Sequence, residues 1–296
     1  MTAGEQGMLL MTSSLGDPTR KPLTVAQFRK LTQRVHNAPS PHEDRDMTED
    51  DIIALGYSME DALRIIKLLS EKGKLKQYLQ KADETGCKPI TRVNAHYPQL
   101  LRHRLKLDTP GSLWVKGDMK LLSKPAISVV GSRELRDENW KFAAEIGRQA
   151  ALQNYVLISG NARGADSIAQ ESCLASGGKI IAIVPDALCN YPARENVLYL
   201  SADAFDAPFS SQRALYRNQL IHCMGQKVFV AQCSFGKGGT WSGTVNNLKH
   251  HYSDVFCLRD ESEASIQLSQ LGATLITGQD LLDIGALEAH YCQLSL

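Results

Sequence analysis

The chain has 296 residues, of which 43% are hydrophobic and 22% are charged, and its formal net charge at pH 7 is +1. This composition is typical of a globular protein with one large or two ordinary domains. It excludes a polycation, so nucleic-acid binding would have to come from a local cluster of basic residues. Neither a membrane-spanning run nor the pattern of a secretory signal is evident, so we expect no membrane partner.

The seven cysteines are scattered singly along the chain. They form neither a C-x-x-C pair nor a cysteine–histidine cluster with zinc spacing. Several lie inside apolar runs, where a thiol behaves as a small hydrophobic group. We therefore expect a reducing, cytoplasmic location, and we expect neither a metal nor another cofactor.

The first part of the chain changes character at residue 23. Residues 1–22 are rich in Gly, Ser, Thr and Pro and predict a disordered tail. Residues 23–85 carry apolar side chains at three- and four-residue spacing and predict a small helical domain, with a loop at residues 37–46. Because acids balance its lysines, we interpret this domain as a packing cap, with a nucleic-acid or partner module as the alternative. Residues 86–125 predict short strands and turns, an extension that leads into the main sheet.

From residue 126 onward, short apolar runs alternate with amphipathic segments. This alternation predicts a doubly wound, mostly parallel α/β sheet over residues 126–296, buried on both faces. A short helix is predicted at Asn196–Ser201. The predicted strands are Ala126–Val130, Tyr155–Ile158, Lys179–Val184, Lys227–Ala231, Asp254–Leu258 and Ala273–Ile276.

Glycine-rich turns follow several of these strands, at the edge where such sheets bind ligands. Glycine lets a ligand approach the backbone, a helix N-terminus offers free N–H groups, and arginine or lysine binds phosphate. Asp166 is expected to orient Arg163 or to cap the helix that it starts. We predict an anion pocket formed by Gly131, Ser132, Arg133, Gly160, Arg163, Gly164, Asp166, Lys237, Gly238, Gly239 and Thr240.

Motifs for catalysis are not found in the sequence. The segment around Gly236 lacks the pattern of an ATP-binding P-loop, and the turn at Gly131 lacks G-x-G-x-x-G. There is no G-x-S-x-G nucleophile elbow and no acid pair at a defined spacing. We therefore predict a binding protein rather than an enzyme, and we assign no catalytic residue.

A predicted helix after residue 210 carries further candidates. Arg213 and Arg217 are four residues apart, with Tyr216 on the neighbouring stripe. Two arginines beside an aromatic ring suit a single-stranded backbone with a stacked base, although a solvated helix face with Tyr216 in the core is the alternative. Trp241 fits a base pocket or the core equally well.

Three sequence motifs together resemble the DNA-processing protein A (DprA/Smf) family. They are V-V-G-S-R at Val129–Arg133, I-S-G-x-A-R-G-x-D at Ile158–Asp166, and R-N-x-x-I at Arg217–Ile221. The resemblance covers roughly residues 95–260. It implies a Rossmann-like fold that binds single-stranded DNA in a basic pocket including Asn218. It also implies transfer of that DNA to a RecA-type recombinase, and homodimer formation.

The glycine-rich segment at residues 238–244 supports an alternative function. It is similar to the G-G-x-G-T loop of the phosphoribohydrolases often labelled lysine decarboxylase-like. The acid that follows the loop in those proteins is not matched here, where Asn246 and Asn247 stand in that region. The alternative is a Rossmann protein that senses or hydrolyses a nucleotide derivative.

Overall fold

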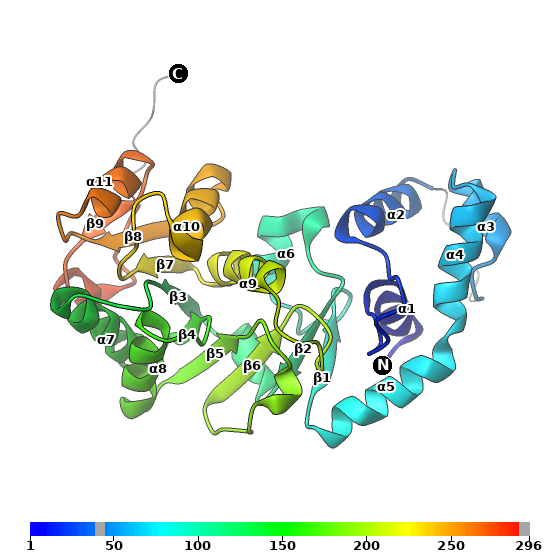
Figure 1. Ribbon diagram of the computed structural model, residues 1–296, viewed down its shortest axis with the longest axis horizontal. Helices are drawn as coiled ribbons and strands as arrows, with labels where there is room; N and C mark the ends of the chain where they lie inside the picture. The colour runs from blue at the N-terminus through cyan, green and yellow to red at the C-terminus, as the bar shows by residue number, and fades with distance from the viewer. Residues whose placement is uncertain (39–44, 290–296) are drawn as a thin grey trace.

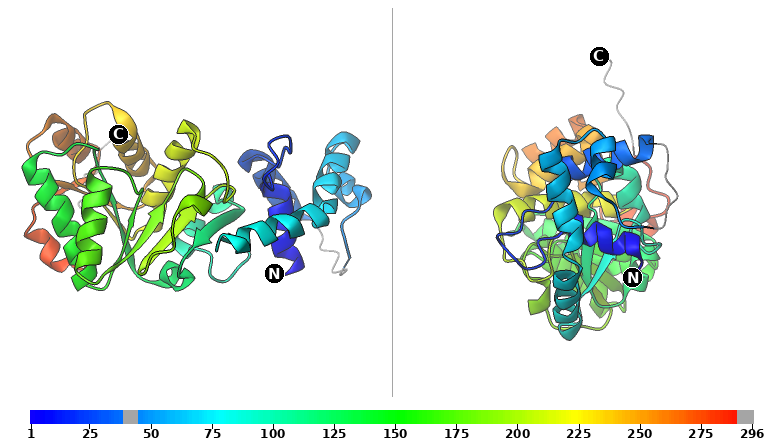
Figure 2. Two further views of the ribbon diagram at one scale, coloured as in Figure 1. Left: turned by 60° about the horizontal axis from the view of Figure 1, so that its bottom comes forward. Right: turned by 90° about the vertical axis from the view of Figure 1, so that its right-hand side faces the viewer.

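The computed structural model describes residues 1–38 and 45–289. Part of the predicted loop at residues 37–46, and Cys292, lie outside these ranges. The helical part at the N-terminus lies at one end of the molecule, next to β1 and β2 (Figures 1 and 2). It comprises α1 (Ala3–Thr12), α2 (Val25–Asn37), α3 (Glu49–Ala54), α4 (Met59–Ser70) and α5 (Lys72–Glu84).

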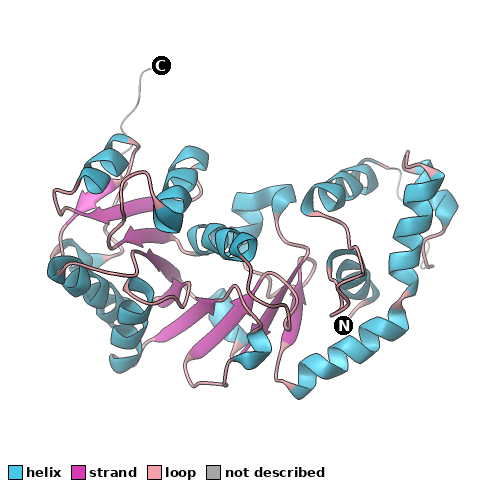
Figure 3. Ribbon diagram, in the orientation of Figure 1, coloured by secondary structure: helices cyan, strands magenta, loops and turns pink. Residues whose placement is uncertain are grey.

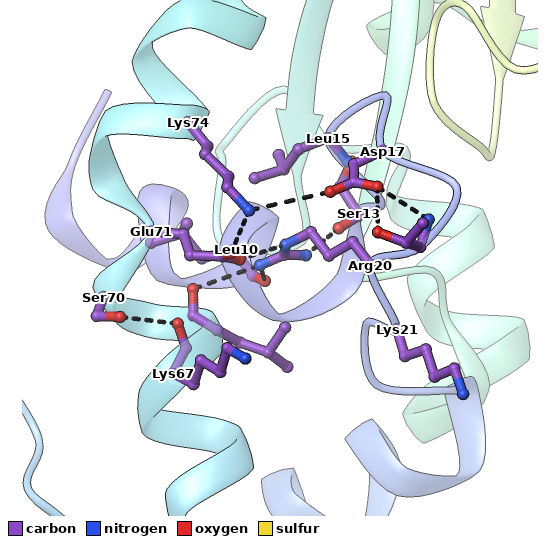
Figure 4. A network of polar contacts seen from close by, with 12 residues as sticks. Leu10, Ser13, Leu15, Asp17, Arg20, Lys21, Lys67, Ser70, Glu71 and Lys74 are labelled. Carbon is purple, nitrogen blue, oxygen red and sulfur yellow. Dashed lines mark hydrogen bonds and ion pairs between the residues drawn. The ribbon is translucent and has the colours of Figure 1, made fainter.

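The prediction of a disordered tail at residues 1–22 was wrong. Thr2 and Glu5 form a capping box that starts α1, and Leu9 and Leu10 are buried. The following segment is fixed by Arg20, whose guanidinium donates to the carbonyl oxygens of Leu10, Ser13 and Leu68 and to the carboxylate of Glu71 (Figure 4). Long-range contacts of this kind order a segment that is too polar to predict as structured.

Among the described residues, nine strands form one sheet in the order β1-β2-β6-β5-β4-β3-β7-β8-β9. Figure 3 draws the strands in magenta and the helices around them in cyan. The strands from β6 to β9 are parallel, whereas β1 and β2 are antiparallel additions at one edge. The strands are β1 (Lys88–Thr91), β2 (Ser112–Lys116), β3 (Ala126–Val130), β4 (Val156–Ser159), β5 (Lys179–Ile183), β6 (Val197–Ser201), β7 (Lys227–Val230), β8 (Asp254–Leu258) and β9 (Thr274–Ile276).

This topology confirms the predicted mostly parallel, Rossmann-like α/β sheet with a small helical part before it. One element was predicted wrongly, because residues 197–201 form β6 rather than a short helix. Every residue of β6 is buried, and the strand pairs with β5 on one side and β2 on the other. A run that is apolar throughout fits a buried strand as well as a buried helix, and here the two neighbouring strands decide.

Helices cover both faces of the sheet. On one face, α7 (Asp137–Leu152) and α8 (Ala165–Ala175) pack over residues such as Ile127 and Leu157. The other face is covered by α6 (Gln99–Leu105), α9 (Ser211–Met224), α10 (Gly238–His250) and α11 (Glu263–Gln270). Short 3₁₀ segments lie at Lys106–Asp108, Met119–Ser123, Leu188–Asn190 and Asp280–Asp283.

The helical part packs directly against the sheet. Tyr78 of α5 joins Trp114 and Phe205 in an aromatic cluster with ring centroids 4.8–5.4 Å apart. The Tyr78 hydroxyl also donates to Asp206 at 2.6 Å. These contacts fasten the helical part to the edge of the sheet. Across the described ranges, no helix combines the length and the apolar character needed to cross a bilayer.

Candidate functional site

A pocket of about 860 Å³ lies at the carboxyl ends of β3 and β7. These two strands are neighbours, but the chain leaves β3 toward β4 and leaves β7 toward β8, in opposite directions across the sheet. Such a switch point opens a crevice between the outgoing loops, and ligands of α/β proteins bind there. The pocket is therefore where the topology of this sheet places a ligand.

The turn after β3 and the start of α8 interlock at the pocket wall. The Ala165 N–H donates to the Ser132 carbonyl oxygen at 3.1 Å. Gly164 has φ +91°, and a Cβ there would lie 2.4 Å from that same oxygen. A Cβ on Gly131 would lie 2.4 Å from the Cβ of Ala165. The two glycine-rich turns predicted to form one site are thus in contact, and glycine is required where they meet.

The turn after β7 closes the other side. The Ser132 N–H donates to the Gln232 carbonyl oxygen at 2.9 Å, and the Thr240 hydroxyl donates to the Gly131 carbonyl oxygen at 3.0 Å. Gly238, Gly239 and Thr240 line the pocket with the first turn of α10. Within the described residues, no side chain caps this helix start, so its N–H groups and the positive end of the helix dipole are available to an anion.

Two basic side chains line the pocket and are exposed, Arg133 and Lys237. In the described part of the chain, neither has a hydrogen-bonding or ion-pair partner for its charged group. Arg163 is exposed as well but does not line the pocket. Two acids also line the pocket, the exposed Glu134 and the buried Asp166. The accessible charge is therefore positive on the side formed by the β3 and β7 turns.

Asp166 does not position Arg163, contrary to expectation. Its carboxylate accepts the N–H groups of Gly160 at 2.9 Å and Ala162 at 3.2 Å, and it lies 4.0 Å from the Arg217 guanidinium. Burial raises the pKa of Asp166 to about 6, although Arg217 and the two N–H groups act in the opposite direction. Asp166 therefore holds the β4 turn and faces Arg217 at the back of the pocket.

Arg217 crosses to the β4 turn from α9. Its guanidinium donates to the carbonyl oxygen of Gly160, and a Cβ at Gly160 would overlap the guanidinium. Burial lowers the pKa of Arg217. Next to it, the Asn218 amide donates to the Gly239 carbonyl oxygen at 3.4 Å and joins α9 to α10. Both side chains line the pocket and tie its elements together.

The other two members of the predicted helix face lie elsewhere. Arg213 donates to the carbonyl oxygens of Ala207 and Pro208 and lies 3.2 Å from Asp203, so it is outside the lining of this pocket, although it lines the second pocket described below. Tyr216 packs against the core under α9, which is the alternative to base stacking that the sequence left open for this residue. Trp241 also packs there and meets Phe235 edge to face, with ring centroids 5.0 Å apart.

Several lining residues were not predicted. Gln232 ends the apolar run of β7, and its polar character at that point was a usable signal. His222 is fully buried, and burial lowers its pKa to about 4, so the ring is neutral at pH 7. Nothing in the sequence marked the exposed apolar residues Phe209 and Leu215, because their place in the pocket depends on how the loop before α9 folds.

A second pocket, of about 760 Å³, lies along α9. Its lining includes residues of the N-terminal part, such as Thr24, and polar residues of α10, such as Asn246. It shares four lining residues with the first pocket, namely Leu215, Arg217, Asn218 and Gly239. The two hollows therefore adjoin along α9.

The fold is similar to those of solved DNA processing proteins. The structure of DNA processing protein A from Streptococcus pneumoniae matches with a TM-score of 0.73 and 24% identity, covering 97% of this chain and 99% of that one. A second match is DNA processing protein A from Helicobacter pylori, a structure solved to study how that protein binds single-stranded DNA. It has a TM-score of 0.56 and 23% identity over 67% of this chain and 94% of that one.

Sequence comparison leads to the same group of proteins. The DNA processing protein DprA of Streptococcus pneumoniae is 29% identical over 59% of this chain and 67% of its own length. That of Bacillus subtilis is 28% identical over 54% of this chain and 57% of its own length. The matches thus span between half and two thirds of these relatives. The family model of DNA recombination-mediator protein A matches residues 88–284, and the chain therefore belongs to that family.

Proposed function

We propose that the pocket between the β3, β4 and β7 turns binds the sugar–phosphate backbone of single-stranded DNA. The observation that carries this proposal is the position of Arg133 and Lys237. Both are exposed and line the pocket beside the uncapped start of α10. Basic side chains and free helix N–H groups directed at one site are the features that bind phosphate.

A strand fits this region better than a mononucleotide does. The two adjoining pockets share residues of α9, so one extended ligand can occupy both. Family membership and the single-stranded DNA binding mode of the Helicobacter pylori relative support the same ligand. The role is binding rather than catalysis, because the buried acid Asp166 is already engaged by two N–H groups and faces Arg217.

The test measures affinity for fluorescent oligothymidylate by anisotropy at several salt concentrations. The wild-type protein should bind more weakly as salt rises, because binding to phosphates releases counterions. Replacing both Arg133 and Lys237 by Ala should weaken binding at least tenfold at low salt. The slope of the logarithm of the binding constant against the logarithm of salt concentration should become shallower by about 1.4, or about 0.7 per phosphate contact. Arg163→Ala should have a smaller effect, since Arg163 lies outside the lining.

The matched control removes the same charge at the other edge of the sheet. Lys124 precedes β3 and Lys179 starts β5, and both are exposed. The double variant with Ala at both positions should bind as the wild type does. If it were equally impaired, the binding would reflect net charge and not the pocket. Displacement of the oligonucleotide by a mononucleotide at equimolar concentration would favour the nucleotide-sensing alternative.

Transfer of the strand to a RecA-type recombinase and assembly into a homodimer rest on family resemblance. For the first, the protein should shorten the lag before recombinase filaments form on strands coated with single-strand binding protein. An unchanged lag would reject that role. For the second, sedimentation equilibrium should give twice the chain mass, and a monomer at all concentrations would contradict it.

A further inference from the structure

One wall of the 860 Å³ pocket is apolar. Phe209 has 61% of its surface exposed, the largest fraction for any aromatic side chain in the described residues, and Leu215 has 60% exposed. Both line the pocket, together with Ala214. The same pocket carries Arg133 and Lys237 on the turns of β3 and β7. Its lining is therefore divided between a cationic side and an apolar, aromatic side.

The backbone on both sides of Phe209 is fixed. The Arg213 guanidinium donates to the carbonyl oxygens of Ala207 and Pro208, the two residues before Phe209. Arg213 is itself held by Asp203 at 3.2 Å. On the other side, the Ser210 hydroxyl accepts the Arg213 N–H at 3.2 Å and caps α9. A ring on a fixed backbone loses little conformational entropy when a ligand packs on it.

We infer that Phe209 is a stacking platform for a nucleobase of the bound strand and that it selects single-stranded over double-stranded DNA. This inference rests on the proposed function. A nucleotide of a single strand has an anionic phosphate and an exposed aromatic base, so it matches both sides of the divided lining. In a duplex, the base faces are covered by their neighbours, so the ring gains no stacking partner.

Arg213 has a further role in this arrangement. It is a positioning residue for Phe209, because its guanidinium holds the loop that presents the ring, and it also lines the second pocket. Leu215 extends the apolar wall from the second turn of α9. The cationic side supplies attraction to any polyanion, whereas the aromatic side responds only to an accessible base.

The experiment compares three substitutions on the full chain. Phe209→Ala removes the ring, and Phe209→Trp keeps an aromatic surface. Leu152→Ala is the control, because Leu152 is an exposed apolar residue at the C-terminal end of α7 and lines neither pocket along α9. Each protein is titrated with oligothymidylate, with an abasic oligonucleotide of equal length and phosphate number, and with a duplex of that length.

Phe209→Ala should weaken oligothymidylate binding about tenfold and reduce the ratio of the affinities for oligothymidylate and duplex. The affinity for the abasic oligonucleotide and the dependence of binding on salt concentration should stay unchanged. Phe209→Trp should restore the affinity, with quenching of indole fluorescence on binding. Equal losses for the base-bearing and abasic strands would overturn the inference, because the ring would then act through pocket shape.

Two other outcomes separate this inference from the proposed function. If Phe209→Ala bound oligothymidylate as the wild type does while the Arg133 and Lys237 double variant did not, only the stacking role would be rejected. If the wild-type protein bound no oligonucleotide at low salt, the proposed function would fail, and the stacking role with it.

Discussion

Asp166 and Arg217 face each other behind the pocket, with 4.0 Å between a carboxylate oxygen and a guanidinium nitrogen. Their side chains are only 9% and 13% exposed. Asp166 starts α8 and holds the turn after β4, whereas Arg217 comes from α9 and reaches the carbonyl oxygen of Gly160 in that turn. The pair therefore joins the two helices that lie on opposite faces of the sheet at its ligand-binding edge.

Breaking this pair should destabilise the fold. Arg217→Met keeps the bulk of the side chain but leaves Asp166 buried without its cation, so we expect a loss of about 3 kcal/mol at pH 7. In the Asp166→Asn background the same substitution should cost at least 1 kcal/mol less, since no buried anion remains. Urea unfolding of the four proteins in this double-mutant cycle measures the coupling. Strictly additive losses would show that the two charges do not interact.

Asp166 should also make stability depend on pH. Burial raises its pKa from 3.8 to about 6 in the folded protein. The folded state therefore holds this proton more tightly than the unfolded chain does. The stabilising contribution is complete below pH 3.8 and is lost as the pH rises through 6. The difference of about two pH units corresponds to roughly 3 kcal/mol.

The measurement for this prediction is a difference between two proteins. Asp166→Asn removes the titration, while every other group remains in both chains and cancels. The free energy of unfolding of the variant, relative to the wild type, should therefore rise by roughly 2.5 kcal/mol between pH 4 and pH 7.5. Parallel stability curves over that range would mean that the pKa of Asp166 is not raised.

The sequence predicted the sheet because parallel strands buried on both faces are continuous apolar runs, and glycine-rich turns marked their carboxyl ends. It could not predict which residues from distant turns meet. Asp166 was paired with Arg163, its neighbour in the chain, because the approach of Arg217 from α9 depends on how α9 crosses the sheet. Nor could the sequence show that Arg213 holds the loop before α9, since that loop folds back onto the arginine only in three dimensions.

The N-terminal segment shows a second limit of sequence reasoning. The apolar stretch at residues 8–11 is too short to predict a core helix, yet Leu9 and Leu10 are buried under α4, α5 and the sheet edge. The capping box of Thr2 and Glu5 was the local signal that could have indicated α1. Local pattern finds such a helix start, but only tertiary contacts decide that the helix persists.

The glycines of the turns around the pocket should differ sharply in their tolerance of a side chain. At Gly164, with φ +91°, an added Cβ would lie 2.4 Å and 2.5 Å from the backbone carbonyl oxygens of Ser132 and Arg133. These atoms cannot move without opening the turn after β3, so Gly164→Ala should cost roughly 3 kcal/mol or more and weaken oligonucleotide binding.

Gly236 is the matched control for that substitution. It has φ +67°, and no heavy atom of the described residues lies within 4 Å of an added Cβ, its chain neighbours aside. Gly236→Ala should therefore cost only about 1 kcal/mol, the penalty of the left-handed backbone conformation. Thermal and urea unfolding of both variants test the contrast. Equal losses would mean that backbone conformation, and not the contact with the β3 turn, sets the requirement for glycine at position 164.

Arg20 should be essential for the attachment of the N-terminal segment. Its side chain is 3% exposed, and it donates to Glu71 at 2.6 Å and to Leu10 and Leu68 carbonyl oxygens at 2.5 Å and 3.3 Å (Figure 4). Arg20→Ala leaves these carbonyl oxygens without the guanidinium and removes one of the two cations that pair with Glu71, whose other oxygen accepts from Lys74 at 2.7 Å. We therefore expect a loss of about 3 kcal/mol. Amide hydrogen exchange in α1 should accelerate more than exchange in β3.

The control for Arg20 is another arginine of the same region whose ion pair is exposed. Arg29 lies 2.9 Å from Asp108, with both side chains about half exposed, so Arg29→Ala should cost less than about 1 kcal/mol. The comparison contrasts a buried arginine that also donates to carbonyl oxygens with an exposed one, since both substitutions remove one arginine and its ion pair with an acid. Equal costs for the two, or unchanged exchange in α1 of the Arg20 variant, would show that apolar packing of Leu9 and Leu10 is enough to hold this helix in place.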